Sequence, residues 1–466
     1  MNNDISWLRS LVCLLAGVAL IILLTTRYKV HAFFALLISC AVVGLGVGLS
    51  PDSVISTAKD GFGNIMRSLG FIIVLGTTLG VLLEHTGATR VMAGYILRRT
   101  GERRASLAMS ITGFIVGLPI FCDSGFIVLS GLNKSLARRS HTPMVVMSAS
   151  LATGLYSVHC LIPPHPGAAA AAGVIGVEFS RLILYGIIVA IPAAIAGYVW
   201  ARFAGRGASV ETDEALEDDA TGQQAVQRTA KGQERSSPGE AGGGSGPSVI
   251  TAFLPVVIPI TLIGLRAFFS IGNTHPSPTL SFFLALGDPV VALFIGVLLA
   301  FSGGREWKRH HLGSLLNDAV EKAGSILVII GAGGAFGAIL AATKMGDQLS
   351  VSLPLSSLGI FFPFLLTASL KTAQGSSTVA IITASSIVKP LLPALGLATG
   401  NGPLLCVLSM GAGSMLLSHA NDAYFWVITR LSGLGLKAML KTYTPATALM
   451  GVIAYAAVYI LSRLIG

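Results

Sequence analysis

Charged side chains are scarce in this chain. Asp, Glu, Lys and Arg make up 11% of its 466 residues, whereas a soluble domain carries about 25%. Eight of the 21 acidic residues lie within residues 211–240, so the remainder is nearly free of carboxylates. With 53% hydrophobic residues and a mean hydropathy of +0.77, this composition excludes an ordinary soluble fold and predicts an integral membrane protein.

Cysteine is also rare, and the common nucleotide-binding and catalytic motifs are absent. None of the five cysteines belongs to a CxxC pair, so we expect small buried residues and no metal or redox site. The sequence contains no GxxxxGKS/T phosphate loop, no GxGxxG dinucleotide loop and no HExxH motif. We therefore expect no cofactor, no metal and no enzymatic activity. A membrane-embedded hydrolase that uses Asp123 or the histidines is the enzymatic alternative.

Long apolar runs take the place of charged segments. Crossing a bilayer takes roughly 20 apolar residues. Several runs approach or reach that length: Leu11–Thr25, Val30–Leu49, Phe71–Leu83, Leu182–Trp200, Val290–Phe301, Ile326–Ala342 and Ala446–Leu461. The first run lacks an A-x-A cleavage site, so we interpret it as a retained helix. The sequence predicts an all-α polytopic membrane protein of about ten to fourteen membrane segments, some too short to span.

The positive charge of the chain is concentrated in short loops. The formal net charge is +10, but the basic residues cluster between apolar runs at 98–104, 134–139, 305–309 and 430–441. This is the positive-inside pattern of cytoplasmic loops. It argues against nucleic acid as a partner and predicts a multi-pass protein in the lipid bilayer of the bacterial cytoplasmic (inner) membrane.

One polar segment divides the chain. Residues 205–248 are acidic and then rich in Gly and Ser, which predicts a disordered, solvent-exposed linker. It separates a first membrane half, 1–204, from a second, 249–466. The two halves resemble each other over about 58–202 and 313–464. Both contain glycine pairs that allow close helix packing, namely Gly76 with Gly80 and Gly333 with Gly337.

The loop charges predict that the two halves have opposite orientations. The basic loops at 98–104 and 134–141 correspond to second-half regions at 355–361 and 391–402, which hold no Lys or Arg. Conversely, the basic loops of the second half correspond to first-half regions almost free of positive charge. Cytoplasmic signals that are out of phase are expected of two inverted-topology repeats, as in many secondary transporters.

The segment between the first two basic loops is too short to cross the membrane twice. Only Ala105–Asn133, about 29 residues, separates them. We therefore expect a re-entrant hairpin or two broken half-helices. The middle of the segment, 117–125, contains the Gly, Pro and Asp residues that break a helix. Irregular backbone at membrane depth requires protein or a water-filled cavity around it.

Asp123, Ser124 and Gly125 form the polar centre of this predicted hairpin. A carboxylate within an apolar stretch is costly, so it is a functional hypothesis by default. Asp123 suits the role of a proton carrier or of a hydrogen-bond partner for a hydroxylated substrate. The alternative is structural, because Asp and Ser are good N-terminal caps for the second half-helix.

The second half carries a polar counterpart between two apolar runs. Its polar and flexible residues are Lys371, Gln374, Gly375, Ser376, Ser377 and Thr378. If a half-helix begins here, its free N–H groups and positive dipole end face a bound anion, and Lys371 adds a formal charge. A polar external loop with capping residues is the alternative.

A proline-rich break interrupts the first half further along. Three prolines within 163–166 preclude a regular helix. His159 and His165 flank or lie within this break, and imidazoles titrate near neutral pH. They suit a proton relay or a hydrogen bond to substrate, and a structural turn is the alternative.

The corresponding break in the second half is the polar cluster 418–422. It presents His419, Asn421 and Asp422, which suit a hydrated cavity. The alternative is an interfacial loop followed by an aromatic belt at Tyr424 and Trp426.

Four motifs together resemble one known family. They are GLPIFCDSGFIVL at 117–129, LIPPHPG at 161–167, AQGSSTVAIITAS at 373–385 and LSHANDAYFWV at 417–427. In this order they are similar to signature segments of the gluconate:proton symporter (gluconate permease) family of the ion-transporter superfamily. The resemblance covers nearly the whole chain. Lys371 stands where the family pattern leads us to expect Arg, and the linker 205–248 is unusually long and acidic.

The resemblance implies inverted repeats whose re-entrant hairpins meet near mid-membrane, an elevator-type homodimer, and proton-coupled uptake of gluconate or a related small hydroxylated carboxylate. D-serine or glycerate-type hydroxy acids are the alternative substrates, and a channel or a non-transporting receptor is a less favoured function. We expect substrate binding by Asp123, Ser124, Gly125, His165, Lys371, Gln374, Gly375, Ser376, Ser377, Thr378, Asn421 and Asp422. We expect proton coupling through Asp123, His159, His165, His419 or Asp422.

Overall fold

The computed structural model describes residues 7–205, 247–270, 277–303, 309–343 and 355–465. Most of the linker predicted at 205–248 and part of the basic loop at 305–309 lie outside these residues. Within the described ranges the chain is helical and contains no strand. The expectation of an all-α chain is thereby confirmed.

The described part of the first half is a series of α-helices joined by short connections. In chain order they are α1 (Trp7–Thr26), α2 (Ala32–Gly46), α3 (Pro51–His85), α4 (Ala88–Thr100), α5 (Ala105–Gly117), α6 (Cys122–Arg139), α7 (Met144–Leu161), α8 (Pro166–Ile175) and α9 (Phe179–Ala204).

The described part of the second half consists of a similar series. It contains α11 (Val249–Ser270), α12 (Pro278–Leu286), α13 (Pro289–Ser302), α14 (Arg309–Ala342), α16 (Phe361–Gln374), α17 (Ser377–Val388), α18 (Gly402–Met415), α19 (Ala423–Ser432) and α20 (Leu436–Ile465).

Membrane-length helices make up the body of the molecule. By length and composition, six described helices can cross a bilayer. A seventh span results if α12 and α13, which are bent by 62° to each other, are counted as one, and four shorter apolar helices are also present among the described residues. Large hydrophobic side chains such as Phe34, Phe71, Ile195 and Leu464 are exposed on the outside. Such a surface suits lipid and does not suit water.

Helix breaks occur at the four places where Gly, Pro and polar residues predict them. The first lies at 118–121 between α5 and α6, and the second at 162–165 between α7 and α8. The third lies at 375–376 between α16 and α17, where Gly375 has a φ of +81° that favours glycine. The fourth lies at 416–422 between α18 and α19.

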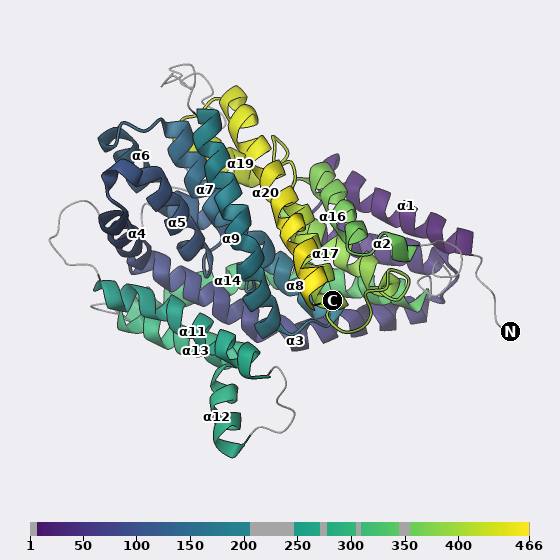
Figure 1. Cartoon of the computed structure of the whole chain (residues 1–466). Helices are drawn as coiled ribbons and strands as arrows, with labels where there is room; N and C mark the ends of the chain where they lie inside the picture. The colour runs from purple at the N-terminus through teal and green to yellow at the C-terminus, as the bar shows by residue number, and fades with distance from the viewer. Residues whose placement is uncertain (1–6, 206–246, 271–276, 304–308, 344–354, 466) are drawn as a thin grey trace.

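The two longest helices, α3 and α14, pack against each other (Figure 1), and their contacts show that they run in opposite directions. In the first third of α3, a Cβ on Gly61 would meet Gly334 and Ala338 near the end of α14. Towards the end of α3, the carboxylate of Glu84 interacts instead with Lys322, near the start of α14. Residue numbers therefore rise along α3 as they fall along α14.

A second antiparallel pair joins the last helix of each half. The indole Nε1 of Trp200, near the end of α9, donates to the carbonyl of Thr442 near the start of α20 (3.0 Å). At the opposite end, Asn401 accepts a hydrogen bond from Arg181 near the start of α9 and donates to the carbonyl of Ile465 at the end of α20. The helix that precedes each long helix packs against the long helix of the other half: α2 packs on α14, and α13 packs on α3.

The four predicted packing glycines lie where these long helices meet the broken segments. A Cβ on Gly76 would collide with Pro164, and one on Gly80 with the carbonyl of Pro119. In the second half, a Cβ on Gly333 would collide with Ile382 of α17. A Cβ on Gly337 would lie 3.4 Å from Ser386 of the same helix. Small residues thus let each long helix approach the broken helices closely.

Candidate substrate site

A polar cavity of about 610 Å³ lies where the four helix breaks converge. Its lining residues from the first half are Phe121, Cys122, Asp123, Ser124, Tyr156, His159 and Pro166. The second half contributes Lys322, Ser325, Ile326, Gln374, Gly375, Ser376, Ser377, Thr378, Asn421, Asp422, Ala423 and Tyr424. The volume is within the range of small-molecule sites.

Asp123 places a carboxylate in this cavity from the first turn of α6. Because α6 begins directly after the break at 118–121, the side chain projects from the start of a helix and not from the middle of a continuous helix. Its Oδ1 is buried and, among the described residues, has no hydrogen-bond partner. A buried acceptor without a partner costs about 1–3 kcal/mol. A substrate that donates a hydrogen bond there would recover that free energy.

The break between α16 and α17 contributes an amide and a helix N-terminus. Both amide atoms of Gln374, Oε1 and Nε2, are buried and lack a hydrogen-bond partner within the described chain. Ser376 caps α17, because its Oγ accepts from the N–H of Val379 (3.3 Å). Ser377 and Thr378 begin the helix and line the cavity, where free N–H groups attract an anion.

Lys371 and Asp422 form an ion pair in the wall of the cavity. The ammonium Nζ lies 3.2 Å from Oδ2 of Asp422, with the two side chains 0% and 9% exposed. Oδ2 also accepts from the hydroxyl of Ser418 (2.5 Å), and Oδ1 accepts from the N–H of Tyr424 (3.0 Å), capping α19. Asp422 lines the cavity and Lys371 does not.

Asn421 fixes the third and fourth breaks against each other. Its Nδ2 donates to the carbonyl of Thr372 (2.6 Å), and its own backbone carbonyl lies where a Cβ on Gly375 would stand. Only a glycine permits this approach. The amide side chain is exposed on the cavity side of that contact.

Tyr156 of α7 connects the two halves at the back of the cavity. Its hydroxyl lies 2.6 Å from Oγ of Ser377 and donates to the carbonyl of Ser414 (3.1 Å). Ser377 Oγ also reaches the same carbonyl (3.1 Å). The ring of Tyr156 stacks on those of His159 and Tyr424. These contacts hold the first turn of α17 in place against α7 and α18.

Two histidines lie side by side next to the first break. Their ring centroids are 4.9 Å apart. His159 lines the cavity, and His165 lies behind it, where Nε2 is 2.6 Å from the carbonyl of Gly117. The Nδ1 atoms of both rings are buried and have no hydrogen-bond partner among the residues described. The pair therefore extends from the cavity towards the end of α5.

The structure brings most of the predicted site residues to one cavity. Gly125 is buried beside it against Leu155 and does not line it. His165 and Lys371 lie directly behind lining residues, and His419 is half-buried and is not part of the lining. Sequence reasoning did not select Lys322, Ser325, Tyr156 or Tyr424, which belong to the lining. Tyr156 gave no distinct signal, because Ser150, Thr153 and Ser157 are further hydroxyls in the same run.

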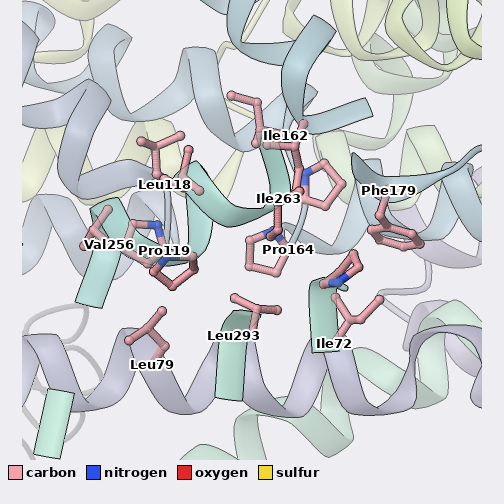
Figure 2. Close-up of a pocket in the computed structure, with 15 residues that line it drawn as sticks. Ile72, Leu79, Leu118, Pro119, Ile162, Pro164, Phe179, Val256, Ile263 and Leu293 are labelled. Carbon is pink, nitrogen blue, oxygen red and sulfur yellow. The ribbon is translucent and has the colours of Figure 1, made fainter. Parts of the chain in front are cut away.

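A second, apolar cavity of about 30 Å³ lies on the other side of the first-half breaks. Figure 2 shows the two proline-containing breaks over α3, with Ile72 and Leu79 below Pro119 and Pro164. Helices α11 and α13 complete its wall with residues such as Val256 and Leu293. All of its lining side chains are apolar. These side chains pack against the two breaks, and the cavity has no polar group for a polar ligand.

Broken helices around a polar cavity, within a bundle of membrane-length helices, define a membrane transporter. No cluster of three or more His, Cys, Asp or Glu side chains suited to a metal ion occurs in the described ranges. The chain belongs to the GntP permease family, whose model, described as "GntP family permease", matches residues 9–465. Its multi-pass helices and its family place it in the bacterial inner membrane.

Individual relatives match over nearly their whole length. A gluconate permease of Pseudomonas aeruginosa is 33% identical over 449 residues, covering 95% of each chain. The inner membrane permease YgbN of Escherichia coli is 30% identical over 450 residues, with 95% of this chain and 96% of the relative covered. A D-serine transporter, DsdX of Escherichia coli, is 30% identical over 463 residues, covering 97% and 98%.

One solved structure supports the fold alone. The YdaH transporter of Alcanivorax borkumensis superposes with a TM-score of 0.65 at 15% sequence identity, covering 94% of this chain and 98% of that one. The relatives are permeases and transporters, so the chain transports a small molecule across the membrane and is not an enzyme.

Proposed function

We propose that this transporter imports gluconate or a related small hydroxylated carboxylate together with a proton. The observation that carries the proposal is the set of unpartnered polar atoms in one cavity. Asp123 Oδ1, the two amide atoms of Gln374 and Nδ1 of His159 are all buried there without hydrogen-bond partners in the described chain. A ligand with several hydroxyl groups satisfies both donors and acceptors, and the free N–H groups at the start of α17 suit its carboxylate.

The substrate site in this proposal consists of Asp123, Ser124, Gln374, Asn421 and the first turn of α17, the segment 375–378. Asp422 lines the same site with its carboxylate. Gly125, His165 and Lys371 lie behind the lining residues and hold them in place. A gluconate permease among the relatives favours the hydroxylated carboxylate. The D-serine transporter among them makes D-serine the alternative, since Asp123 suits an ammonium group as well as a hydroxyl.

Proton coupling is assigned to the titratable groups at the cavity and beside it. Asp123 and His159 line the cavity, and His165 continues from His159 away from it. Asp422 is engaged with Lys371, and His419 lies outside the lining, so these two are weaker candidates. A carboxylate that binds a proton together with an anionic substrate avoids the burial of an unpaired charge.

The helices broken at 118–121 and 375–376 are proposed to be re-entrant hairpins within two inverted repeats, about 58–202 and 313–464. The antiparallel pairing of α3 with α14 and of α9 with α20 supports this, since a two-fold axis in the membrane plane reverses the direction of every corresponding helix. The reciprocal packing of α2 on α14 and α13 on α3 supports it further. We also propose the homodimer implied by the family resemblance and the tethering role of the segment 205–248.

Uptake in proteoliposomes tests the proposal. Purified protein should accumulate labelled gluconate when the lumen is alkaline, and an uncoupler should abolish that accumulation. A competition panel of gluconate, other sugar acids, D-serine and glycerate then ranks the substrates. Accumulation that depends on sodium and not on a proton gradient contradicts the coupling, and D-serine outcompeting every sugar acid contradicts the substrate class.

A further inference from the structure

The charged side chains on the cavity wall differ in whether they have a buried partner of opposite charge. Asp123, Lys322 and Asp422 are the charged residues that line it. Asp422 already faces the ammonium of Lys371, which is fully buried. Within the described part of the chain, Lys322 of α14 is therefore the one cation that lines the cavity.

Lys322 and the first residues of α17 line the same cavity. Helices α14 and α17 pack in the same direction, because Gly333 contacts Ile382 and Gly337, one turn later, approaches Ser386. The hydroxyl of Ser386 also donates to the carbonyl of Gly333 (2.7 Å). Both helices rise 1.5 Å per residue, so the same register continued towards the start of each helix puts residue 328 level with Ser377, and Lys322 about 9 Å before it. The shared lining of the cavity agrees with this placement.

This arrangement brings two positive potentials to one place. A helix N-terminus carries about half a positive charge, and an ammonium that faces the same cavity is best accommodated when an anion lies between them. Two carboxylates of the described chain act on Lys322. Asp318, one turn earlier on the same helix, pairs with it at 2.9 Å with side chains 34% and 48% exposed, and Glu84 at the end of α3 interacts with it electrostatically. Such a half-exposed pair contributes little to stability, so a bound carboxylate displaces it easily.

We propose that Lys322 is the specificity-determining residue that binds the carboxylate of the substrate, jointly with the first turn of α17. This assignment rests on the proposed function. It orients the ligand: the carboxylate lies between Lys322 and Ser377–Thr378, and the hydroxylated end faces Gln374 and Asp123. Neutral analogues of the same shape are then poor substrates, because they leave the ammonium and the helix N-terminus without an anion.

The test compares gluconate with its neutral amide, gluconamide, as competitors of labelled gluconate uptake in proteoliposomes. The wild-type chain should prefer gluconate. Lys322→Gln should raise the KM for gluconate about tenfold, the loss expected for a charge-assisted hydrogen bond, and should bring the two competitors close to equal potency. Lys134→Gln, at an exposed site on α6, is the matched control and should change neither value.

A variant of the counter-ion separates binding from a structural role. Asp318→Asn should lower the KM by up to about fivefold, because it releases Lys322 from its intrahelical pair. A wild-type KM and undiminished discrimination in Lys322→Gln overturn the assignment. Equal losses in Lys322→Gln and Asp318→Asn also overturn it, since the pair would then be structural. Failure of the wild-type chain to take up any hydroxylated carboxylate overturns the proposed function instead, and this assignment with it.

Discussion

Lys371 and Asp422 join the third helix break to the fourth through an ion pair of 3.2 Å, with the lysine side chain entirely buried. The lysine comes from the last turn of α16, and the aspartate is the N-terminal cap of α19. One carboxylate thus receives the ammonium, the hydroxyl of Ser418 and the N–H of Tyr424. This contact fixes the polar wall on which the proposed substrate site depends.

Breaking this ion pair should destabilise the protein strongly. Lys371→Gln leaves the carboxylate of Asp422 buried without its counter-charge, at a cost of about 3–5 kcal/mol. Thermal unfolding in detergent should show a clear fall in Tm. The double variant Lys371→Gln/Asp422→Asn removes both charges and should recover part of that loss, and a double variant no more stable than the single one contradicts the pairing.

Asp123→Asn should reduce transport without reducing stability. Oδ1 has no partner to lose among the described residues, so the fold gains or keeps stability while the substrate or the proton loses its acceptor. We expect initial uptake of gluconate to fall about tenfold or more, with unchanged membrane insertion and Tm. Glu102→Gln, at an exposed carboxylate outside the cavity, should transport at the wild-type rate. A normal rate in Asp123→Asn would remove this residue from the site.

Gly375→Ala should be more harmful than the same change at another left-handed glycine. Both Gly375 and Gly396 have positive φ values, +81° and +70°, so alanine costs about 1–2 kcal/mol of backbone strain at either. Only at Gly375 does the new Cβ also collide with the carbonyl of Asn421, whereas the position beside Gly396 is open. Tm and uptake measured for both variants should separate them, and equal effects would contradict the close approach of the two breaks.

Tyr156→Phe should loosen the contact between the halves. The variant removes the hydroxyl that lies against Ser377 and the carbonyl of Ser414, which should cost about 0.5–1.5 kcal/mol. We expect a modest fall in Tm and a larger fall in uptake, because the first turn of α17 is held by this contact. Tyr28→Phe changes an exposed tyrosine and should alter neither. Unchanged uptake in Tyr156→Phe would mean that α17 is positioned by other contacts.

Ser376→Ala should affect the anion end of the site. Ser376 Oγ caps α17 at Val379, and loss of such a cap costs about 1 kcal/mol. Uptake should fall more than Tm does, since the same turn is proposed to bind the carboxylate. Ser356→Ala, at an exposed serine outside the lining, is the control. A small loss in Tm with a normal rate of uptake in Ser376→Ala would show that Ser376 is a structural cap and does not bind substrate.

The helix breaks were predictable because their causes are local. Proline cannot donate a backbone hydrogen bond and clashes with the preceding turn, which explains the break between α7 and α8 around 162–165. Gly375 occupies a left-handed conformation that most other residues avoid. Asp422 and Ser376 are N-terminal caps, as residues of their type commonly are.

The partners of these residues were not predictable, because they depend on long-range packing. Lys371 lies only four residues before the break at 375–376, yet it is buried against Asp422 and does not line the cavity. Lys322 lies in a stretch that resembles an ordinary amphipathic surface, with Asp318 one turn away. Nothing in the spacing of either lysine indicates which one faces the cavity. That outcome is decided by how α14, α16 and α17 pack.

Substrate protection of single cysteines tests the central claim, that substrate binds where the breaks of the two halves meet. Cysteines are introduced at Ser124 and at Ser376 in a background without the native cysteines, with a cysteine at exposed Ser135 as the control. Gluconate should slow alkylation at both 124 and 376, with one half-maximal concentration close to the KM for uptake, and should leave 135 unaffected. Alkylation at 124 and 376 that gluconate does not slow, in a protein that still transports it, would contradict the account.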